Sequence, residues 1–416
     1  MSEWQTFCLK DLGKIVGGAT PPTNNLKNYG NKIAWITPKD LSTLQGRYIK
    51  KGSRSISRLG FKSCSCVLLP KHAILFSSRA PIGYVAIAEK RLCTNQGFKS
   101  IIPNKKIYFE FLYYLLKYHK DNISNIGGRT TFKEVSGATL GLFQVKIPPT
   151  YYEQQKIART LSVLDQRIEN NHKINELLHK ILELLYEQYF VRFDFLDENN
   201  KPYQTSGGKM KFSKELNRLI PNDFEVKTLG ELVDIFSGYS FQSNTYSNNK
   251  NDYILITNKN VQHSLIDLSI TTNLLFLPKK LPKYCLLEPT NILITLTGHI
   301  GRCALVFSKN CILNQRVGVV LPKEKELNPF YYSLIRNPLF SAILQRNAIG
   351  SSQQNLSPID TLKIQIPFNH KIIKQYSKTC ENIIKLLVSN MQSTQTLTAL
   401  RDFLLPLLLK QQVKPK

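Results

Sequence analysis

Few of the patterns that mark membrane proteins or metal sites occur in this chain of 416 residues. It has no run of 18 apolar residues, so we expect no membrane-spanning helix. Its first residues, MSEWQTFCLKDLG, lack the basic and then apolar pattern of a signal peptide, and we expect a cytoplasmic protein. The eight cysteines include no Cys-x-x-Cys pair and no histidine pair stands near them, which favours reduced core thiols over a metal site.

Catalytic signatures are missing as well. The P-loop pattern is absent, no glycine-rich cofactor loop follows an apparent strand, and no triad or metal cluster stands out. The sequence DFEVK at 223–227 has a nuclease-like carboxylate–lysine spacing, but it lies in a polar stretch. NPFY at 328–331 lacks the second proline of an adenine methyltransferase motif. The sequence therefore predicts a protein without a catalytic site of its own.

Acidic residues are scarce, and one long stretch has none. The chain has 56 Lys and Arg against 29 Asp and Glu, and its net charge of +27 favours an acidic partner, most often nucleic acid. Residues 41–88 contain no Asp or Glu. Phosphates are the natural counter-charge for such a stretch, although a merely solvated basic face remains the alternative. The predicted phosphate contacts, with Lys71 also in the stretch, are Arg47, Lys50, Lys51, Arg54, Arg58, Lys62 and Arg79.

The second half of the chain has acid-free runs at 289–323 and 327–359, but they are less densely basic. Base reading needs forked donors and amides, and two loops offer them beside glycine, which lets backbones approach closely. An ordinary turn before a strand is the alternative, and Asn95-Gln96 and Asn314-Gln315 are weaker candidates that could cap turns. The DNA-contact candidates are Arg129, Thr130, Thr131 and Lys133 in the first loop, Ser351, Gln353, Gln354 and Asn355 in the second, and Arg302, Arg316 and Arg346.

Two stretches have a heptad pattern with apolar ends and a polar middle. The first seam contains Ile157, Leu161, Leu164, Ile168, Asn171, Asn175, Leu178, Leu182, Leu185 and Tyr189. The second contains Tyr376, Thr379, Ile383, Leu386, Asn390, Ser393, Leu397, Leu400, Leu404 and Leu407. A long helix with an apolar seam needs a partner. We predict an antiparallel coiled coil in which the register is set by Asn171, Asn175, Asn390 and Ser393; two separate surface helices are the alternative.

The chain also repeats itself about 220 residues on. ITPKDL at 36–41 recurs as ITNKNV at 256–261, and LGKIVGG at 12–18 recurs as LVDIFSG at 232–238. Ile-Gly at 82, Asn-Gln at 95, Tyr-Tyr at 113 and Ile-Pro at 147 return at 300, 314, 331 and 366. So long a period indicates duplicated domains rather than a solenoid.

The expected fold class is α+β, with two homologous mixed domains, two long helices and an internal pseudo-two-fold repeat. Apolar runs at 67–69, 73–76 and 291–296 predict buried strands, and 108–118 and 329–344 have helical spacing. The expected parts are a first domain at 1–150, a helix at 151–193, a linker or loosely packed loop at 194–225, a second domain at 226–368 and a helix at 369–410.

Several motifs resemble a known family. WITPKDL at 35–41, RAPIG at 79–83 and NQG at 95–97 resemble parts of a target recognition domain. IPP at 147–149 with EQQKI at 153–157 resembles its exit into a helix, and GGKM at 207–210 with LGE at 229–231 resembles the lead into a second copy. Together they resemble the DNA specificity (S) subunit of type I restriction–modification enzymes, over nearly the whole chain. The second half departs at Asn258, Asn260 and His370–Ile372.

The resemblance implies a non-catalytic, sequence-specific DNA-binding subunit in which each target recognition domain reads one half of a bipartite site. It implies that the coiled coil sets the spacing and docks two modification (methyltransferase) subunits, and that restriction (nuclease/translocase) subunits complete the complex. No cofactor is then expected on this chain; S-adenosylmethionine, ATP and Mg²⁺ belong to the partners. The alternatives are an enzyme with an unrecognised site and a coiled-coil scaffold whose charge serves RNA binding or solubility.

Overall fold

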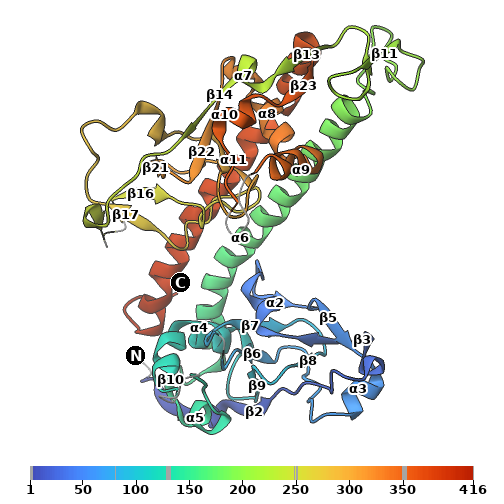
Figure 1. Ribbon diagram of the computed structural model, residues 1–416. Coiled ribbons are helices and arrows are strands. Elements are labelled where there is room, and N and C mark those ends of the chain that lie inside the picture. The colour runs from blue at the N-terminus through green and yellow to red at the C-terminus, as the bar shows by residue number, and fades with distance from the viewer. Residues whose placement is uncertain are drawn as a thin grey trace. The chain divides into compact units, whose positions relative to one another are not determined.

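The computed structural model describes residues 3–79, 81–127, 133–247, 249, 252–348 and 354–415 (Figure 1). The chain divides into unit 1, residues 1–172 with 394–416, and unit 2, residues 173–393. Helix α6 (Tyr151–Tyr186) begins in unit 1 and ends in unit 2, and α11 (His370–Leu409) does the reverse. None of the helices in the described ranges has the combination of length and apolarity that crossing a membrane requires.

Unit 1 has an α+β fold made of short strands. A five-stranded sheet has the order β2-β9-β6-β7-β4, a three-stranded sheet has the order β5-β3-β8, and β1 pairs with β10. The apolar run predicted at 73–76 forms the buried strand β6. The elements are β1 (Gln5–Cys8), α1 (Leu9–Leu12), β2 (Gly13–Gly17), η1 (Leu26–Asn28), β3 (Tyr29–Ile36), α2 (Pro38–Ser42), β4 (Tyr48–Ile49), β5 (Arg54–Ile56), α3 (Arg58–Lys62), β6 (Ile74–Phe76), β7 (Val85–Ala88), β8 (Cys93–Thr94), β9 (Lys99–Pro103), α4 (Phe109–Asn125), α5 (Gly137–Leu142) and β10 (Gln144–Ile147).

Unit 2 contains a four-stranded sheet, β14-β22-β19-β20, and a five-stranded sheet, β15-β17-β16-β21-β18. Its remaining strands form two antiparallel pairs, β11 with β12 and β13 with β23. The elements are η2 (Glu187–Val191), β11 (Met210–Ser213), β12 (Arg218–Pro221), β13 (Glu225–Thr228), α7 (Leu229–Leu232), β14 (Val233–Ser237), η3 (Ser243–Thr245), β15 (Tyr246–Ser247), β16 (Tyr253–Ile256), β17 (Thr272–Leu274), η4 (Lys283–Cys285), β18 (Leu286–Leu287), β19 (Ile292–Thr295), β20 (Cys303–Leu305), β21 (Cys311–Leu313), β22 (Val317–Pro322), η5 (Lys325–Leu327), α8 (Asn328–Arg336), α9 (Pro338–Arg346), α10 (Pro358–Leu362) and β23 (Gln365–Phe368).

The internal repeat predicted from the sequence is confirmed in strand pairing. β2 pairs antiparallel with β9 as β14 does with β22, and β3 pairs parallel with β8 as β16 does with β21. Gly18 and Gly238 occupy equivalent places, where an added Cβ would lie 2.0 Å from the Asn95 carbonyl oxygen and 2.4 Å from that of Leu313. Because only glycine permits so close an approach of backbones, the repeated LGKIVGG and LVDIFSG sequences share a structural cause.

Two local predictions are corrected. The interpretation of 194–225 as a loosely packed loop is wrong, since β11 and β12 form an antiparallel pair there and Phe195, Ile220 and Phe224 are buried. The helical stretch at 329–344 is two helices rather than one. Asn337 accepts the N–H of Leu339 and has an extended backbone, which ends α8 and starts α9 at Pro338.

The seam predicted on α6 is confirmed. Ile157, Leu161 and Ile168 are buried in unit 1, and Leu182 and Tyr189 are buried in unit 2. In each unit α6 packs against α11. The contacts run antiparallel in both: Asp165 meets Arg401 and Asn171 meets Thr394 in unit 1, while Asn175 meets Asn390 and Leu182 meets Tyr376 in unit 2.

The seam predicted on α11 is partly wrong. Thr379, Leu386, Ser393 and Leu400 are exposed, and the amide of Asn171 donates to Thr394 at 3.2 Å, one residue past Ser393. Asn390 does donate to Asn175, at 3.0 Å. The buried positions follow a 3.6-residue period rather than a heptad, because in unit 2 α11 packs against the domain as well as against α6. They include Ile373, Tyr376, Cys380, Ile384, Leu387 and Met391, and Ile372, Ser377 and Val388 beside them are buried as well.

Candidate nucleic-acid interface

A run of exposed cations in unit 1, called here the basic segment, contains Lys50, Lys51, Arg54, Arg58 and Lys62. Lys50 and Lys51 follow β4, Arg54 begins β5, and Arg58 and Lys62 lie in α3, so one stretch presents all five from short elements. No ion pair neutralises any of the five within the described part of the chain. This surface is therefore positively charged and suited to phosphate.

The start of the basic segment is held by Asp40. Its Oδ1 accepts the N–H of Ser53 at 2.7 Å, and its Oδ2 accepts the N–H and the hydroxyl of Thr37 at 2.8 and 2.7 Å. Burial alone would raise the pKa of the Asp40 carboxyl, but the hydrogen bonds from Ser53 and Thr37 outweigh it and lower the pKa. The negative charge thus remains on the side chain that positions the loop.

Arg47 does not belong to the exposed cations, which corrects the prediction for that residue. Its side chain is 3% exposed. Its guanidinium lies 3.2 Å from Glu110 Oε1 through Nη1 and 3.1 Å from Glu169 Oε1 through Nε. With two carboxylates as partners and no access to solvent, Arg47 fastens β4 to α4 and α6 instead of facing a phosphate.

The other unit 1 candidates are less uniform. Arg79 is half-exposed and shares the carboxylate of Glu134 with Lys99, at 3.7 and 3.4 Å. Lys133 is exposed. Arg129, Thr130 and Thr131 lie outside the described residues.

Unit 2 presents a different set of groups. Arg316, Arg346, Gln354 and Asn355 are exposed, whereas Arg302 is half-buried and its Nη1 donates to Gln262 Oε1 at 3.2 Å. Ser351 and Gln353 lie outside the described residues. The described candidates thus comprise separate cations and two amides, without a dense run like the basic segment.

The loop at the end of β6 in unit 1 and the loop at the end of β19 in unit 2 are held by the same pair of hydroxyl hydrogen bonds. Ser77 Oγ donates to the Pro81 carbonyl and accepts the Tyr84 N–H, both at 2.8 Å. Thr295 Oγ1 donates to the His299 carbonyl at 2.5 Å and accepts the Arg302 N–H at 3.0 Å. Because these hydrogen bonds are equivalent, Pro81 corresponds to His299 and Tyr84 corresponds to Arg302 in the repeat.

The segments that bond to these loops are also equivalent. The Val135 N–H donates to the Ser78 carbonyl at 3.0 Å, as the Leu356 N–H does to Leu296 at 2.7 Å. Lys133 therefore corresponds to Gln354. The described residues at the ends of the two candidate stretches, 133–135 and 354–356, thus lie beside the same strand-end loop of their unit.

In unit 2 this loop borders a cavity of about 340 Å³. Sequence reasoning singled out two of its residues, Arg302 and Gln354, and missed the others. An alignment of residues 295–302 with 77–84 could have identified them, because the hydroxyls of Ser77 and Thr295 make the same hydrogen bonds within the two loops. The lining residues are His263, Gly298, His299, Ile300, Gly301, Arg302, Ser341, Gln345 and Gln354.

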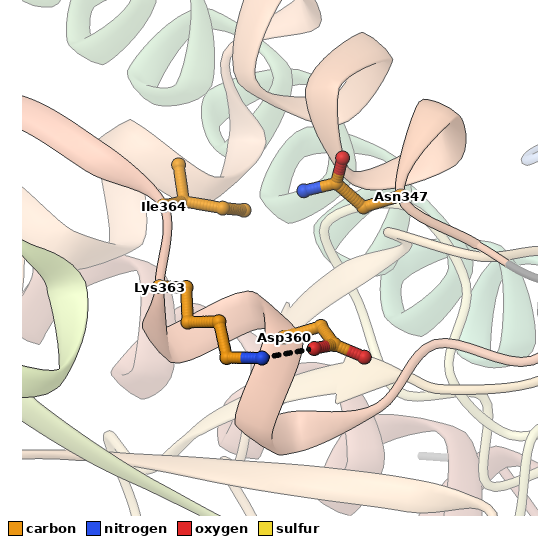
Figure 2. A pocket seen from close by; sticks show the side chains of 4 residues that line it. All are labelled: Asn347, Asp360, Lys363 and Ile364. Atoms are coloured by element: carbon orange, nitrogen blue, oxygen red, sulfur yellow. Dashed lines mark hydrogen bonds and ion pairs between the residues drawn. The ribbon is translucent and has the colours of Figure 1, made fainter. Parts of the chain in front are cut away.

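A second depression in unit 2, of about 380 Å³, is lined by Asn347, Asp360, Lys363 and Ile364 (Figure 2). Figure 2 shows its lysine and carboxylate directed at each other, with Lys363 Nζ 2.9 Å from Asp360 Oδ1. Because the cation is already paired, this depression adds no free charge to the candidate interface.

Among the weaker amide candidates, the Asn95 side chain accepts the Gly97 N–H at 3.0 Å, which supports its interpretation as a turn cap.

In the nuclease-like stretch, Lys227 pairs with Glu225 at 3.0 Å and Asp223 accepts a hydrogen bond from Asn369 at 2.9 Å. Among the described residues no group of three His, Cys, Asp or Glu side chains is arranged to hold a metal ion.

Comparison with known proteins agrees with the duplicated architecture. A family model described as the type I restriction modification DNA specificity domain matches residues 1–180 and again residues 221–398. The chain is 34% identical over 411 residues to the type I restriction enzyme MjaIX specificity subunit of Methanocaldococcus jannaschii, covering 97% of this chain and 92% of that protein. It is 24% identical to the HindI specificity subunit of Haemophilus influenzae, over 99% and 100% of the two chains. The crystal structure of an S subunit from M. genitalium has the same fold, with a TM-score of 0.59 and 18% identity over 97% and 96% of the chains.

Proposed function

Because the chain belongs to the family of type I restriction–modification DNA specificity subunits, we propose that unit 1 and unit 2 each read one half of a divided DNA site. A specificity subunit is not the catalytic member of such a system. The observation that carries the proposal is the basic segment, five exposed cations that form no ion pair among the described residues, on a repeated fold. Two similar units that differ in their loops fit two half-sites of different sequence.

The two-reader proposal is tested by selecting bound duplexes from a randomised pool with the full chain. Replacing Gln353, Gln354 and Asn355 with Ala should relax base preference in one half-site, and Arg129→Ala should do so in the other. Each lost bidentate contact costs about 1–3 kcal/mol of discrimination. Loss of both half-sites from changes in one loop would contradict this assignment of readers.

We also propose that α6 and α11 set the separation of the half-sites. Their antiparallel contacts within each unit support this role, and about 50 Å of helix spans roughly 15 base pairs. Removing a facing heptad from both helices should shorten the unread gap by about three base pairs. Removing a heptad from one helix only should destabilise the protein, since Asn175 and Asn390 lose register. An unchanged gap with intact recognition after the double deletion would show that the helices do not set the spacing.

A third part of the proposal concerns partners. Ile174, Leu177, Ile181 and Leu184 recur at helical spacing on α6 in unit 2 and remain between 41% and 64% exposed. Such a stripe supports docking of modification subunits, and the repeat predicts two copies of them. S-adenosylmethionine, ATP and Mg²⁺ would then be bound by modification and restriction subunits. Leu177→Asp with Leu184→Asp should weaken partner binding but not DNA binding, whereas a strict one-to-one complex at saturation would contradict two copies.

A further inference from the structure

The cavity beside the 295–302 loop is lined by hydrogen-bonding side chains. His299, Gln345 and Gln354 are exposed at it, and among its described lining residues Ile300 is the one branched apolar side chain. Pockets for apolar small molecules are lined predominantly by hydrophobic and aromatic side chains. This lining instead matches a ligand that offers donors and acceptors along one edge.

The walls of the cavity are fixed before any ligand arrives. Besides the two hydrogen bonds of the Thr295 hydroxyl, the Gly298 N–H donates to the Gln354 carbonyl at 3.2 Å, and Thr297 forms an antiparallel β-bridge with Asn355. Gly301 has a φ of +78°, and its position faces Ser341 of α9. The 295–302 loop, α9 and residues 354–355 therefore hold their side chains in one arrangement, which is what selective reading requires.

The polar side chains at the cavity are not needed by the fold. Unit 1 has the same loop hydrogen bonds, although Pro81 stands at the place of His299 and Lys133 at the place of Gln354. Gly83, with φ +101°, faces Lys120 of α4 where Gly301 faces Ser341. Since one backbone accommodates both sets, His299 and Gln354 of unit 2 are not required by the fold and can serve recognition.

We propose that this cavity is the base-reading site of unit 2, and that His299 and Gln345 act with Gln354 to select one purine. The proposal rests on the proposed function. Glutamine amides match the N6 and N7 edge of adenine, so the two glutamines at the cavity favour a purine. Arg302 gives the site positive charge, but because it already donates to Gln262 it is not assigned to reading a base.

The test is selection from a randomised duplex pool with the full chain and with His299→Ala and Gln345→Ala. Each variant should lose roughly 5- to 100-fold of its preference at one base pair in one half-site, while the other half-site is unchanged. Gln345→Glu, which replaces donors with acceptors, should move the preference at that pair toward cytosine. Both residues are exposed, so the unfolding temperatures should match that of the unaltered chain.

Arg346→Ala is the matched comparison, since Arg346 follows Gln345 on α9 and does not line the cavity. It should weaken all duplexes alike or have no effect. If the unaltered chain selects a divided site and the cavity variants select the same one, the cavity proposal fails while the proposed function stands. Uniform weakening by the cavity variants would mean that the cavity holds a phosphate, which also overturns the proposal. A chain that selects no divided site would overturn both.

Discussion

Unit 1 and unit 2 repeat one fold but fasten it to the long helices by different chemistry. In unit 1 the Tyr114 hydroxyl donates to Asp165 at 2.6 Å, and Arg401 pairs with the same carboxylate at 2.8 Å. In unit 2 the equivalent Tyr332 shares a hydrogen bond of 2.8 Å with His179. The equivalent tyrosine thus meets a buried ion pair in unit 1 and a neutral histidine in unit 2, where the ion pair to α6 is instead that of Arg336 with the half-exposed Glu183, at 3.1 Å.

The helix contacts of unit 2 are also more aromatic. Tyr186, Phe190, Phe330 and Tyr376 lie within 6.5 Å of one another as ring pairs, so burial of ring surface contributes more there than charge. A duplicated fold therefore constrains the shape of such a junction and leaves the choice of interaction open. It also predicts that the two units respond differently to the same kind of change.

The largest effect should come from Asp165→Ala. This change leaves Arg401 with only the exposed Asp402, at 2.8 Å, and removes the acceptor of the Tyr114 hydroxyl, and breaking a buried pair costs about 3–5 kcal/mol. His179→Ala removes a neutral hydrogen bond and should cost about 1–3 kcal/mol. Urea unfolding monitored separately for each unit measures both, and equal losses would refute the contrast between charged and neutral fastening.

The basic segment offers the next comparison. Replacing Lys50, Lys51 and Arg54 with Glu should weaken binding to all duplexes on the order of a hundredfold, or about 3 kcal/mol. The slope of log affinity against log salt concentration should also become shallower, by the equivalent of about three phosphate contacts. Exposed Lys325, Lys371 and Lys378 of unit 2 give a control with the same change in net charge. An equal loss in the control would mean that overall charge, not this surface, attracts DNA.

Acid should weaken unit 2 through His179. Burial, with the positive charge of Arg336, lowers the pKa of His179 to about 3. A histidine with a lowered folded pKa contributes its stability fully above the ordinary value near 6.5, and this is lost progressively as the pH falls from about 6.5 toward 3. His179→Gln should flatten that part of the pH profile of unit 2 unfolding. An unchanged slope between pH 7 and 5 would show that His179 is not its source.

The smallest effect should come from exchanging equivalent cap residues. Asn260 accepts from the N–H and hydroxyl of Thr257 as Asp40 does from Thr37, but its amide also donates to the Asp267 and Ile270 carbonyls at 2.9 and 2.8 Å. Asp40→Asn and Asn260→Asp should therefore each cost about 1–2 kcal/mol.

The two exchanges should also differ in their dependence on pH. The lowered pKa of Asp40 makes its contribution complete above about pH 3.8 and lost as the pH falls below it. Asn260 contributes no such dependence. Thermal unfolding of both variants at neutral and acidic pH measures the costs, and a neutral outcome for either exchange would show that the cap does not discriminate between the residues.

Much of the fold could be predicted, but the candidate interface only in part. The α6 seam was correct because Ile157 through Leu182 meet α11 at regular spacing in both units. The α11 seam failed at Leu386 because Leu387, at 0% exposure, is the neighbour that packs inside. A pattern seen in one helix cannot show that a second packing partner shifts its buried face.

The duplication and the family follow from the amino-acid sequence alone, because repeated short motifs such as those at 36–41 and 256–261 record equivalent local structure. The positive charge of a long acid-free stretch follows from it as well. Which of these cations remain available depends on the folded structure. Arg47 is withdrawn by Glu110 and Glu169, carboxylates 63 and 122 residues away, while Lys50 three positions later is exposed. Likewise the cavity at His299 exists only where loops and α9 converge, since ion pairing and cavity walls depend on distances in space that sequence separation does not contain.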